Sequence, residues 1–126
     1  MLKMKPMARA LILTGSTIER QQEMAKKLAE FDGAMATIAW RELVIQNRLA
    51  LAVASRPQTL IVMGMASGTV ERACVHHIVK TGEIEILREN GSVEKHRIPN
   101  FIFCSGLANP MSIERLDRRF SVMHLK

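Results

Sequence analysis

Short apolar runs alternate with amphipathic stretches along the first two thirds of the chain. Residues 8–14 form an apolar run that ends before Gly15, and residues 34–40 and 59–65 form two more. The intervening stretches carry apolar side chains at helical spacing. The pattern predicts buried strands joined by helices, which is typical of a mainly parallel sheet covered on both faces.

Three helices are predicted between these strands. The first spans 18–31, and four of its apolar residues fall on one face, which we expect to be buried. These residues are Ile18, Ala25, Leu28 and Phe31. The second spans 41–55 and is apolar on nearly all sides from 49 to 54, so we expect one well-buried helix. The third runs from Ser67, a suitable N-cap, to about Lys80.

The pattern changes after the third helix. Residues 83–97 alternate polar and apolar side chains around Asn90-Gly91, a dipeptide that strongly favours a tight turn, and so predict a β-hairpin. The remaining predicted elements are strands at 101–105 and 120–125 and a short helix at 112–119. We therefore expect one domain over residues 1–126: a three-layer α/β/α fold with a mainly parallel five-stranded sheet and the hairpin inserted in it.

Composition narrows the class of protein. The 126 residues are 48% hydrophobic and 24% charged, as in a globular domain large enough to bury a core. Two cysteines are too few for a secreted disulfide framework, and Cys104 lies in an apolar run as a small hydrophobic residue would. No apolar run approaches the roughly 20 residues that cross a bilayer. We therefore expect a cytoplasmic protein with no membrane contact.

A net charge of +6 is compatible with a nucleic-acid partner without requiring one. The predicted hairpin holds the candidate contacts to nucleic acid. These are Arg88, Lys95, His96 and Arg97. Four glutamates lie on the same hairpin and nearly cancel this charge. Phosphate binding by the hairpin and an ordinary exposed hairpin therefore both stay open.

The loop after the first strand is a candidate anion site, because ligands of such sheets bind beyond the carboxyl ends of the strands. A phosphate-binding loop needs glycines, a lysine and a hydroxyl side chain. Here Arg20-Gln21-Gln22 stands where Gly-Lys-Ser/Thr belongs, and Glu19 adds a negative charge. The candidate anion-binding residues of this loop are Gly15, Ser16, Thr17 and Arg20.

The turn from Gly64 to Thr69 offers a second candidate pocket. Ser67, Gly68 and Thr69 can either cap the following helix or bind a small anionic substrate at its N-terminus. An enzyme that uses this pocket is the alternative to a binding protein. We expect no metal site at Cys74, His76 and His77, since they lack the spacing of metal ligands. We also expect no cofactor and no nucleophilic catalysis.

The last part of the chain resembles AAA+-type P-loop ATPases. The resemblance is carried by residues 98–106, Ile-Pro-Asn-Phe-Ile-Phe-Cys-Ser-Gly, by residues 113–120, Ile-Glu-Arg-Leu-Asp-Arg-Arg-Phe, and by the order of the elements. Compact replication helicases of phages and viruses, including superfamily 3, are similar in this way. The resemblance implies a strand order of 5-1-4-3-2 and, through these helicases, a phage origin. It also implies that Arg118 and Arg119 correspond to the arginine-finger region, which reaches the nucleotide of an adjacent subunit.

The chain departs from this family where the chemistry takes place. The third strand of these ATPases ends in an Asp-Glu pair, but this chain has Met63-Gly64-Met65, and Gly106 stands at the polar sensor position. Without a magnesium carboxylate or a phosphate lysine, phosphoryl transfer lacks its main charge stabilisation. We therefore expect a catalytically inactive P-loop ATPase-like protein. Its expected partner is a related ATPase, another protein, a second copy of itself or nucleic acid.

Overall fold

The computed structural model describes residues 8–65, 69–105 and 120–125. Its elements, in chain order, are β1 (Arg9–Thr14), α1 (Ile18–Glu30), β2 (Met35–Ala39), the 3-10 helix η1 (Trp40–Val44), α2 (Gln46–Val53), β3 (Thr59–Met63), α3 (Thr69–Thr81), β4 (Glu83–Leu87), β5 (Val93–Arg97), β6 (Asn100–Cys104) and β7 (Phe120–His124). The predicted strands and the first helix are confirmed to within two residues, and the third helix is confirmed from Thr69 onward, while its predicted N-cap, Ser67, lies outside the described residues. The predicted helix at 112–119 lies outside the described residues.

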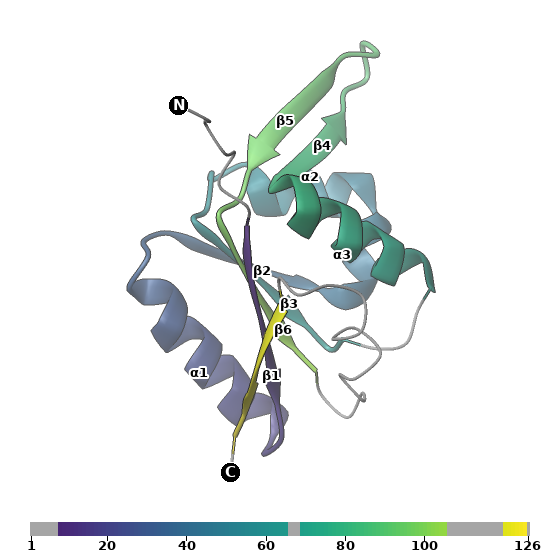
Figure 1. Ribbon diagram of the computed structural model, residues 1–126. Helices are drawn as coiled ribbons and strands as arrows, with labels where there is room; N and C mark the ends of the chain where they lie inside the picture. The colour runs from purple at the N-terminus through teal and green to yellow at the C-terminus, as the bar shows by residue number, and fades with distance from the viewer. Residues whose placement is uncertain (1–7, 66–68, 106–119, 126) are drawn as a thin grey trace, which may run out of the picture.

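The main sheet has five parallel strands in the order β2-β3-β6-β1-β7 (Figure 1). Numbering only these strands along the chain, and starting from the β7 edge, the order is 5-1-4-3-2, as expected. The central strands β3 and β6 are apolar along nearly their whole length because both of their faces are covered. The carboxyl ends of all five strands lie at one edge of the sheet.

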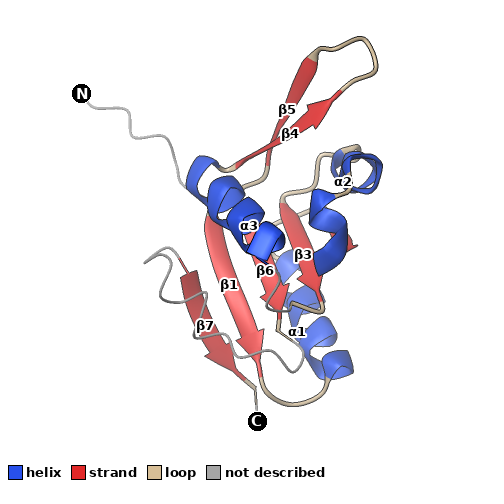
Figure 2. Cartoon of the chain, turned by 90° about the vertical axis from the view of Figure 1, so that its right-hand side faces the viewer, coloured by secondary structure: helices blue, strands red, loops and turns tan. Residues whose placement is uncertain are grey.

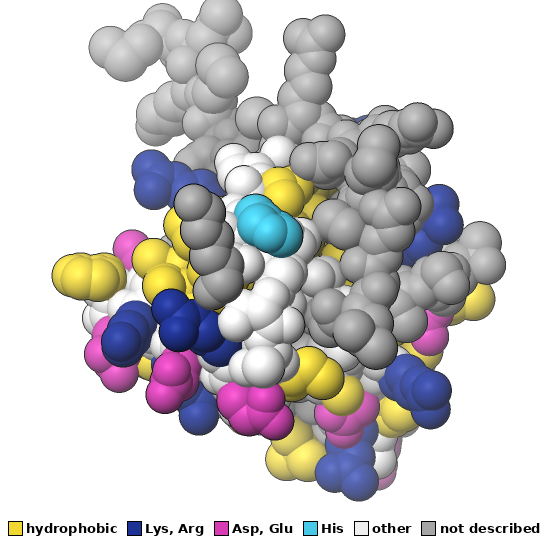
Figure 3. All heavy atoms as spheres, turned by 90° about the horizontal axis from the view of Figure 1, so that it is seen from below, with side chains coloured by type: hydrophobic (Ala, Val, Ile, Leu, Met, Phe, Trp, Pro, Cys, Tyr) yellow, Lys and Arg dark blue, Asp and Glu magenta, His cyan; other side chains and the backbone are white. Residues whose placement is uncertain are grey.

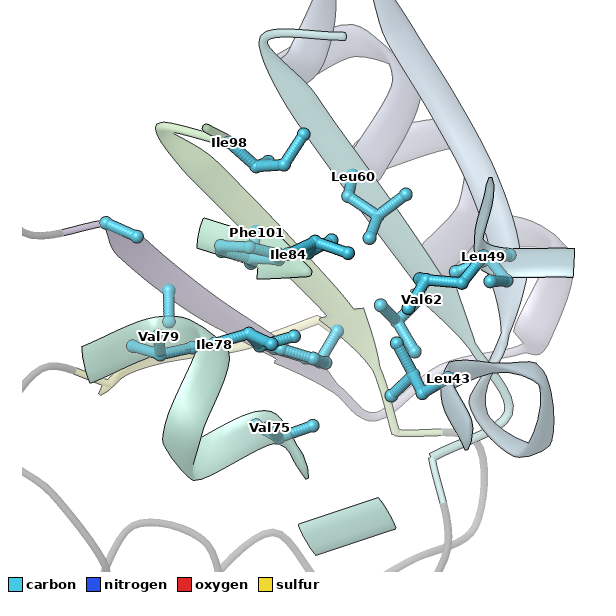
Figure 4. Close-up of a cluster of buried hydrophobic side chains, with 14 of the residues drawn as sticks. Leu43, Leu49, Leu60, Val62, Val75, Ile78, Val79, Ile84, Ile98 and Phe101 are labelled. Carbon is cyan, nitrogen blue, oxygen red and sulfur yellow. The ribbon is translucent and has the colours of Figure 1, made fainter. Parts of the chain in front are cut away.

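Helices cover the two faces of the sheet unequally (Figures 1 and 2). On one face, η1, α2, α3 and the hairpin bury a large apolar cluster against alternate strand residues, part of which is drawn in Figure 4. Its members include Leu43, Leu60, Val75, Ile84 and Phe101. On the other face, α1 is the helix within the described residues that packs on the sheet, mainly on β6 and β3. A smaller cluster around Leu13, Ile61 and Ile102 forms there.

The buried face of α1 differs from the predicted one. Gln21, Ala25 and Ala29 are fully buried, whereas Ile18 is 51% and Phe31 89% exposed. The buried residues follow an i, i+4, i+8 stripe of small or polar side chains, which brings the helix backbone close to the sheet. Ile18 is the first residue of the helix and Phe31 follows its last turn, so neither lies over the sheet. The prediction that both belong to the core is wrong.

The stretch 41–55 does not form the single buried helix that was predicted. Ile45 has extended backbone angles, which separate η1 from α2. The 3-10 turn is stabilised by Glu42, whose carboxylate accepts a hydrogen bond from the Ala39 N–H at 3.0 Å. In α2 only Leu49 and Val53 are buried, and Leu51 is 71% exposed. The helix therefore lies on the surface of the core with one apolar stripe facing inward.

The predicted hairpin is confirmed. Strands β4 and β5 pair antiparallel and form a separate two-stranded sheet that projects beyond the main body (Figures 1 and 2). Gly91 has a positive φ of 85°, which fits its place in the turn. Ile84 and Ile86 on the inner face of the hairpin are buried. The Gln46 side chain accepts a hydrogen bond from the Leu87 N–H at 3.1 Å and so ties the hairpin to α2.

Candidate functional site

The carboxyl edge of the sheet is where this topology places its ligand sites. The loop that joins β1 to α1 lies at this edge, together with the ends of β3, β6 and β7. Figure 3 views the molecule from this side and shows acidic and basic side chains around the rim, with a histidine nearer the centre. The first predicted anion-binding loop is therefore at the expected place.

This loop is too short to surround a phosphate group. Only residues 15–17 separate β1 from α1, since the helix begins at Ile18. Gly15 and Ser16 both have positive φ values, of 78° and 60°, which turn the chain sharply into the helix. Thr17 is the N-cap, and its hydroxyl accepts a hydrogen bond from the Arg20 N–H at 3.2 Å. The backbone thus enters the helix directly, and Arg20 lies in its first turn with an exposed side chain.

Gln21 closes the loop from the helix side. It occupies the position that holds lysine in a phosphate-binding loop counted from Gly15. Its side chain is fully buried, and Nε2 donates a hydrogen bond to the Gly15 carbonyl oxygen at 2.8 Å. An uncharged amide thus binds the loop backbone at the position where a phosphate-binding loop has a cation.

The end of β7 closes the loop from the opposite side. His124 Nδ1 lies 3.0 Å from the Thr14 hydroxyl, and the Leu125 N–H donates to the Thr14 carbonyl oxygen at 2.7 Å. A methyl group added at Gly15 would lie 2.5 Å from the Leu125 carbonyl oxygen and 2.7 Å from Cε1 of His124. The loop is therefore in close contact with the last strand.

The neighbouring strand ends carry no carboxylate. At the end of β3, Met63 is half-buried and Met65 is buried, and the Met65 N–H donates to the Cys104 carbonyl oxygen at 3.0 Å. Ser105, directly after β6, is 1% exposed, and within the described part of the chain its hydroxyl has no hydrogen-bond partner. The positions that hold magnesium ligands in the ATPases described above thus hold methionines.

Several predicted site residues are not described. Ser67, Gly68, Arg118 and Arg119 lie outside the described residues, and Thr69 is known only as the first residue of α3. The second predicted anion pocket and the arginine-finger-like pair therefore stay predictions.

Each predicted nucleic-acid contact on the hairpin lies near or opposite a glutamate. The Arg88 guanidinium pairs with the Glu94 carboxylate, and His96 Nε2 lies 3.2 Å from Glu94 Oε1. The hydrogen bond from Arg88 holds the pKa of Glu94 below its ordinary value. On the outer face of the hairpin, register places Lys95 opposite Glu85 and Arg97 opposite Glu83. These basic side chains are thus divided between two faces and have acidic neighbours on both.

The two cysteines are suited to packing rather than to chemistry. Burial raises the pKa of the Cys104 thiol to about 11 and also raises the pKa of Cys74. Cys74 Sγ donates a weak hydrogen bond to the Leu43 carbonyl oxygen at 3.7 Å. Over residues 8–65, 69–105 and 120–125, no three His, Cys, Asp or Glu side chains are grouped closely enough to hold a metal ion. Neither thiol is activated as a nucleophile.

Sequence reasoning missed two residues that close the first loop. Gln21 was noted only as a departure from the lysine pattern, although its distance of four residues from Ala25 places it on the buried stripe of α1. His124 was not singled out, although the last residue of a strand in a parallel sheet lies at the ligand-binding edge.

No helix within the described ranges is long and apolar enough to span a membrane. Comparison of the sequence with known protein families and with curated proteins found no match.

Proposed function

We propose that this protein has P-loop ATPase ancestry, has lost nucleotide hydrolysis, and works by binding a macromolecular partner. One observation carries the proposal: a sheet with the 5-1-4-3-2 strand order is combined with a first loop that Gln21 and the end of β7 close from two sides. The scaffold suits triphosphate binding, but the loop that would hold the triphosphate is filled by the protein's own groups.

The missing charges support loss of hydrolysis. In-line transfer of a phosphoryl group needs a cation on the β and γ oxygens and a carboxylate-held magnesium ion. Gln21 stands at the lysine position, and Met63-Gly64-Met65 stands at the end of β3. Each missing contribution is worth on the order of several kcal/mol of transition-state stabilisation. A chain that lacks both the phosphate-binding lysine and the magnesium carboxylates has no means to catalyse this reaction at a useful rate.

The charge distribution favours a protein partner over nucleic acid. The hairpin carries three Lys or Arg residues and four Glu residues, so it is not a basic surface. Ion pairs within the hairpin would have to break before Arg88 could bind a phosphate. Fluorescence anisotropy with single-stranded DNA at low salt tests this directly. Binding that weakens in Lys95→Ala/Arg97→Ala and has a shallower salt dependence there would favour nucleic acid instead.

Isothermal titration calorimetry with ATP and magnesium tests the proposal. We expect no saturable heat at nucleotide concentrations up to the millimolar range, because the Gln21 amide and the end of β7 hold the first loop closed. A Gln21→Lys variant is the matched comparison, since it restores the missing cation but leaves the short loop unchanged. Magnesium-dependent binding by the natural sequence, with turnover of ATP, would overturn the proposal.

A further inference from the structure

Beside α1, the part of the sheet that no other described element covers forms an apolar groove. Strand side chains from β1, β6 and β7 form its floor, and the last turn of α1 forms one wall. The hollow measures about 680 Å³. The lining side chains that the argument uses are Arg9, Leu11, Leu28, Phe31, Asp32 and Ile102. Figure 1 shows α1 on this side of the sheet, with α2 and α3 on the opposite side.

A large aromatic ring stands at the rim of this groove. Phe31 is 89% exposed, which is unusual for one of only four phenylalanines in the chain. The same molecule therefore presents an apolar hollow and, beside it, an exposed apolar side chain that the hollow does not enclose. A surface that carries both is complementary to a second copy of itself around a two-fold axis.

The charges at the rim fit the same arrangement. Asp32 directly follows Phe31, and Arg9 comes from the start of β1. Both side chains are exposed, and among the described residues neither forms an ion pair. If Phe31 of one copy enters the groove of the other, Asp32 of that copy approaches a rim that carries Arg9 and the other copy's own Asp32, and opposite charge favours its pairing with Arg9. By symmetry the interaction forms twice.

We infer that the chain forms a symmetric homodimer through this groove, with Phe31 inserted in the partner copy and Asp32 paired with the partner copy's Arg9. The inference deepens the proposed function by naming a partner, yet the two can fail separately, since nucleotide titration does not measure self-association. The contact is built on one aromatic side chain per copy in a hollow of about 680 Å³, so it is small beside the interfaces of stable dimers. The dimer is therefore expected to be weak and to depend on protein concentration, with a Kd of about 100 μM.

Sedimentation velocity over a concentration series tests the dimer. We expect the mass to rise from 14.2 kDa toward twice that value as the concentration increases. Phe31→Ala should weaken association by at least about tenfold, because truncation of a central aromatic anchor costs that much or more. Leu51→Ala is the matched control: Leu51 is 71% exposed on α2, away from the groove, and its removal should leave association unchanged.

Charge exchange tests the pairing itself. Asp32→Lys places two cations together at each contact, and Arg9→Glu places two anions together, so each variant alone should stay monomeric. An equimolar mixture of the two variants restores opposite charges at both contacts and should dimerise. Circular dichroism checks that both variants are folded. Three results would each overturn the inference: a natural protein that is monomeric at all concentrations, a dimer that Phe31→Ala does not weaken, or a mixture of the charge variants that stays monomeric. If the protein is strictly monomeric and binds an amphipathic helical peptide, the groove binds another protein instead.

Discussion

Gly15→Ala tests the contact between the first loop and the end of β7. Gly15 has a φ of 78°, so any residue with a Cβ is strained there. The added methyl group would also lie 2.5 Å from the backbone oxygen of Leu125, which cannot move without shifting the end of the strand. Gly64→Ala is the matched control, because Gly64 has a similar φ of 70° but, among the described residues beyond its two chain neighbours, no atom lies within 4 Å of the added methyl group.

The two substitutions separate backbone strain from steric overlap. Left-handed strain costs about 1–2 kcal/mol, and the lower entropy of the unfolded alanine chain offsets part of it, so Gly64→Ala should destabilise by about 1 kcal/mol. Overpacking adds about 1–3 kcal/mol at Gly15. We therefore expect Gly15→Ala to destabilise the protein by about 2 kcal/mol more than its control.

Urea denaturation followed by circular dichroism measures the difference. With an m-value of about 1.5 kcal/mol per molar urea, the two midpoints should differ by about 1.3 M. Equal midpoints, with unchanged m-values, would mean that the loop does not touch the end of β7. The closed loop would then no longer account for an absence of nucleotide binding.

Three further predictions concern the core, the hairpin and the thiols. Leu49→Ala should cost about 2–5 kcal/mol of unfolding free energy because Leu49 is 4% exposed, whereas Leu51→Ala should change it by less than about 0.5 kcal/mol, and chemical denaturation compares them. In Arg88→Ala, an NMR titration should show the pKa of Glu94 rising toward its ordinary value. Because the pKa of Glu94 is lowered in the folded protein, the ion pair stabilises the fold at any pH above the ordinary pKa of a glutamate. This stabilisation is lost as the pH falls through the pKa that Glu94 has in the folded protein. Cys104, with a pKa of about 11 and 1% exposure, should resist alkylation at pH 8 until the protein unfolds, as a thiol assay with and without denaturant can show.

The centre of the sheet was predictable from the sequence because β3 and β6 are buried on both faces. Continuous apolar runs such as 59–63 are distinct from the helical stretches beside them, and the turn at Asn90-Gly91 marks the hairpin clearly. The strand order followed from the resemblance to P-loop ATPases rather than from the pattern of residues. A hydrophobic pattern alone does not say which strands are neighbours.

The burial of individual helix residues was harder to predict. Phe31 and Leu51 are apolar and lie in helical stretches, yet both are exposed because no described element lies over them. Gln21 is polar and fully buried because the Gly15 carbonyl oxygen is within reach of its amide. In each case burial is decided by what the tertiary arrangement places beside the side chain, which helical periodicity does not report.

The position of the candidate phosphate loop could be predicted from the sequence, but not whether the loop is open to a phosphate group. Gly15 and the lysine-position residue Gln21 are recognisable by spacing, whereas the length of the loop depends on where α1 begins. The helix starts at Ile18 because Thr17 caps it. In the sequence alone, Thr17 could equally be a residue within a longer loop, so the length of the loop was not predictable.

The amide resonances of residues 15–21 during a titration with ATP and magnesium test the central claim most directly. A loop closed by Gln21 and the end of β7 predicts that two-dimensional ¹⁵N–¹H spectra of these amides stay unchanged up to millimolar nucleotide. Saturable shifts centred on Gly15 and Gln21 would show that the loop opens to receive phosphate, and would contradict the account.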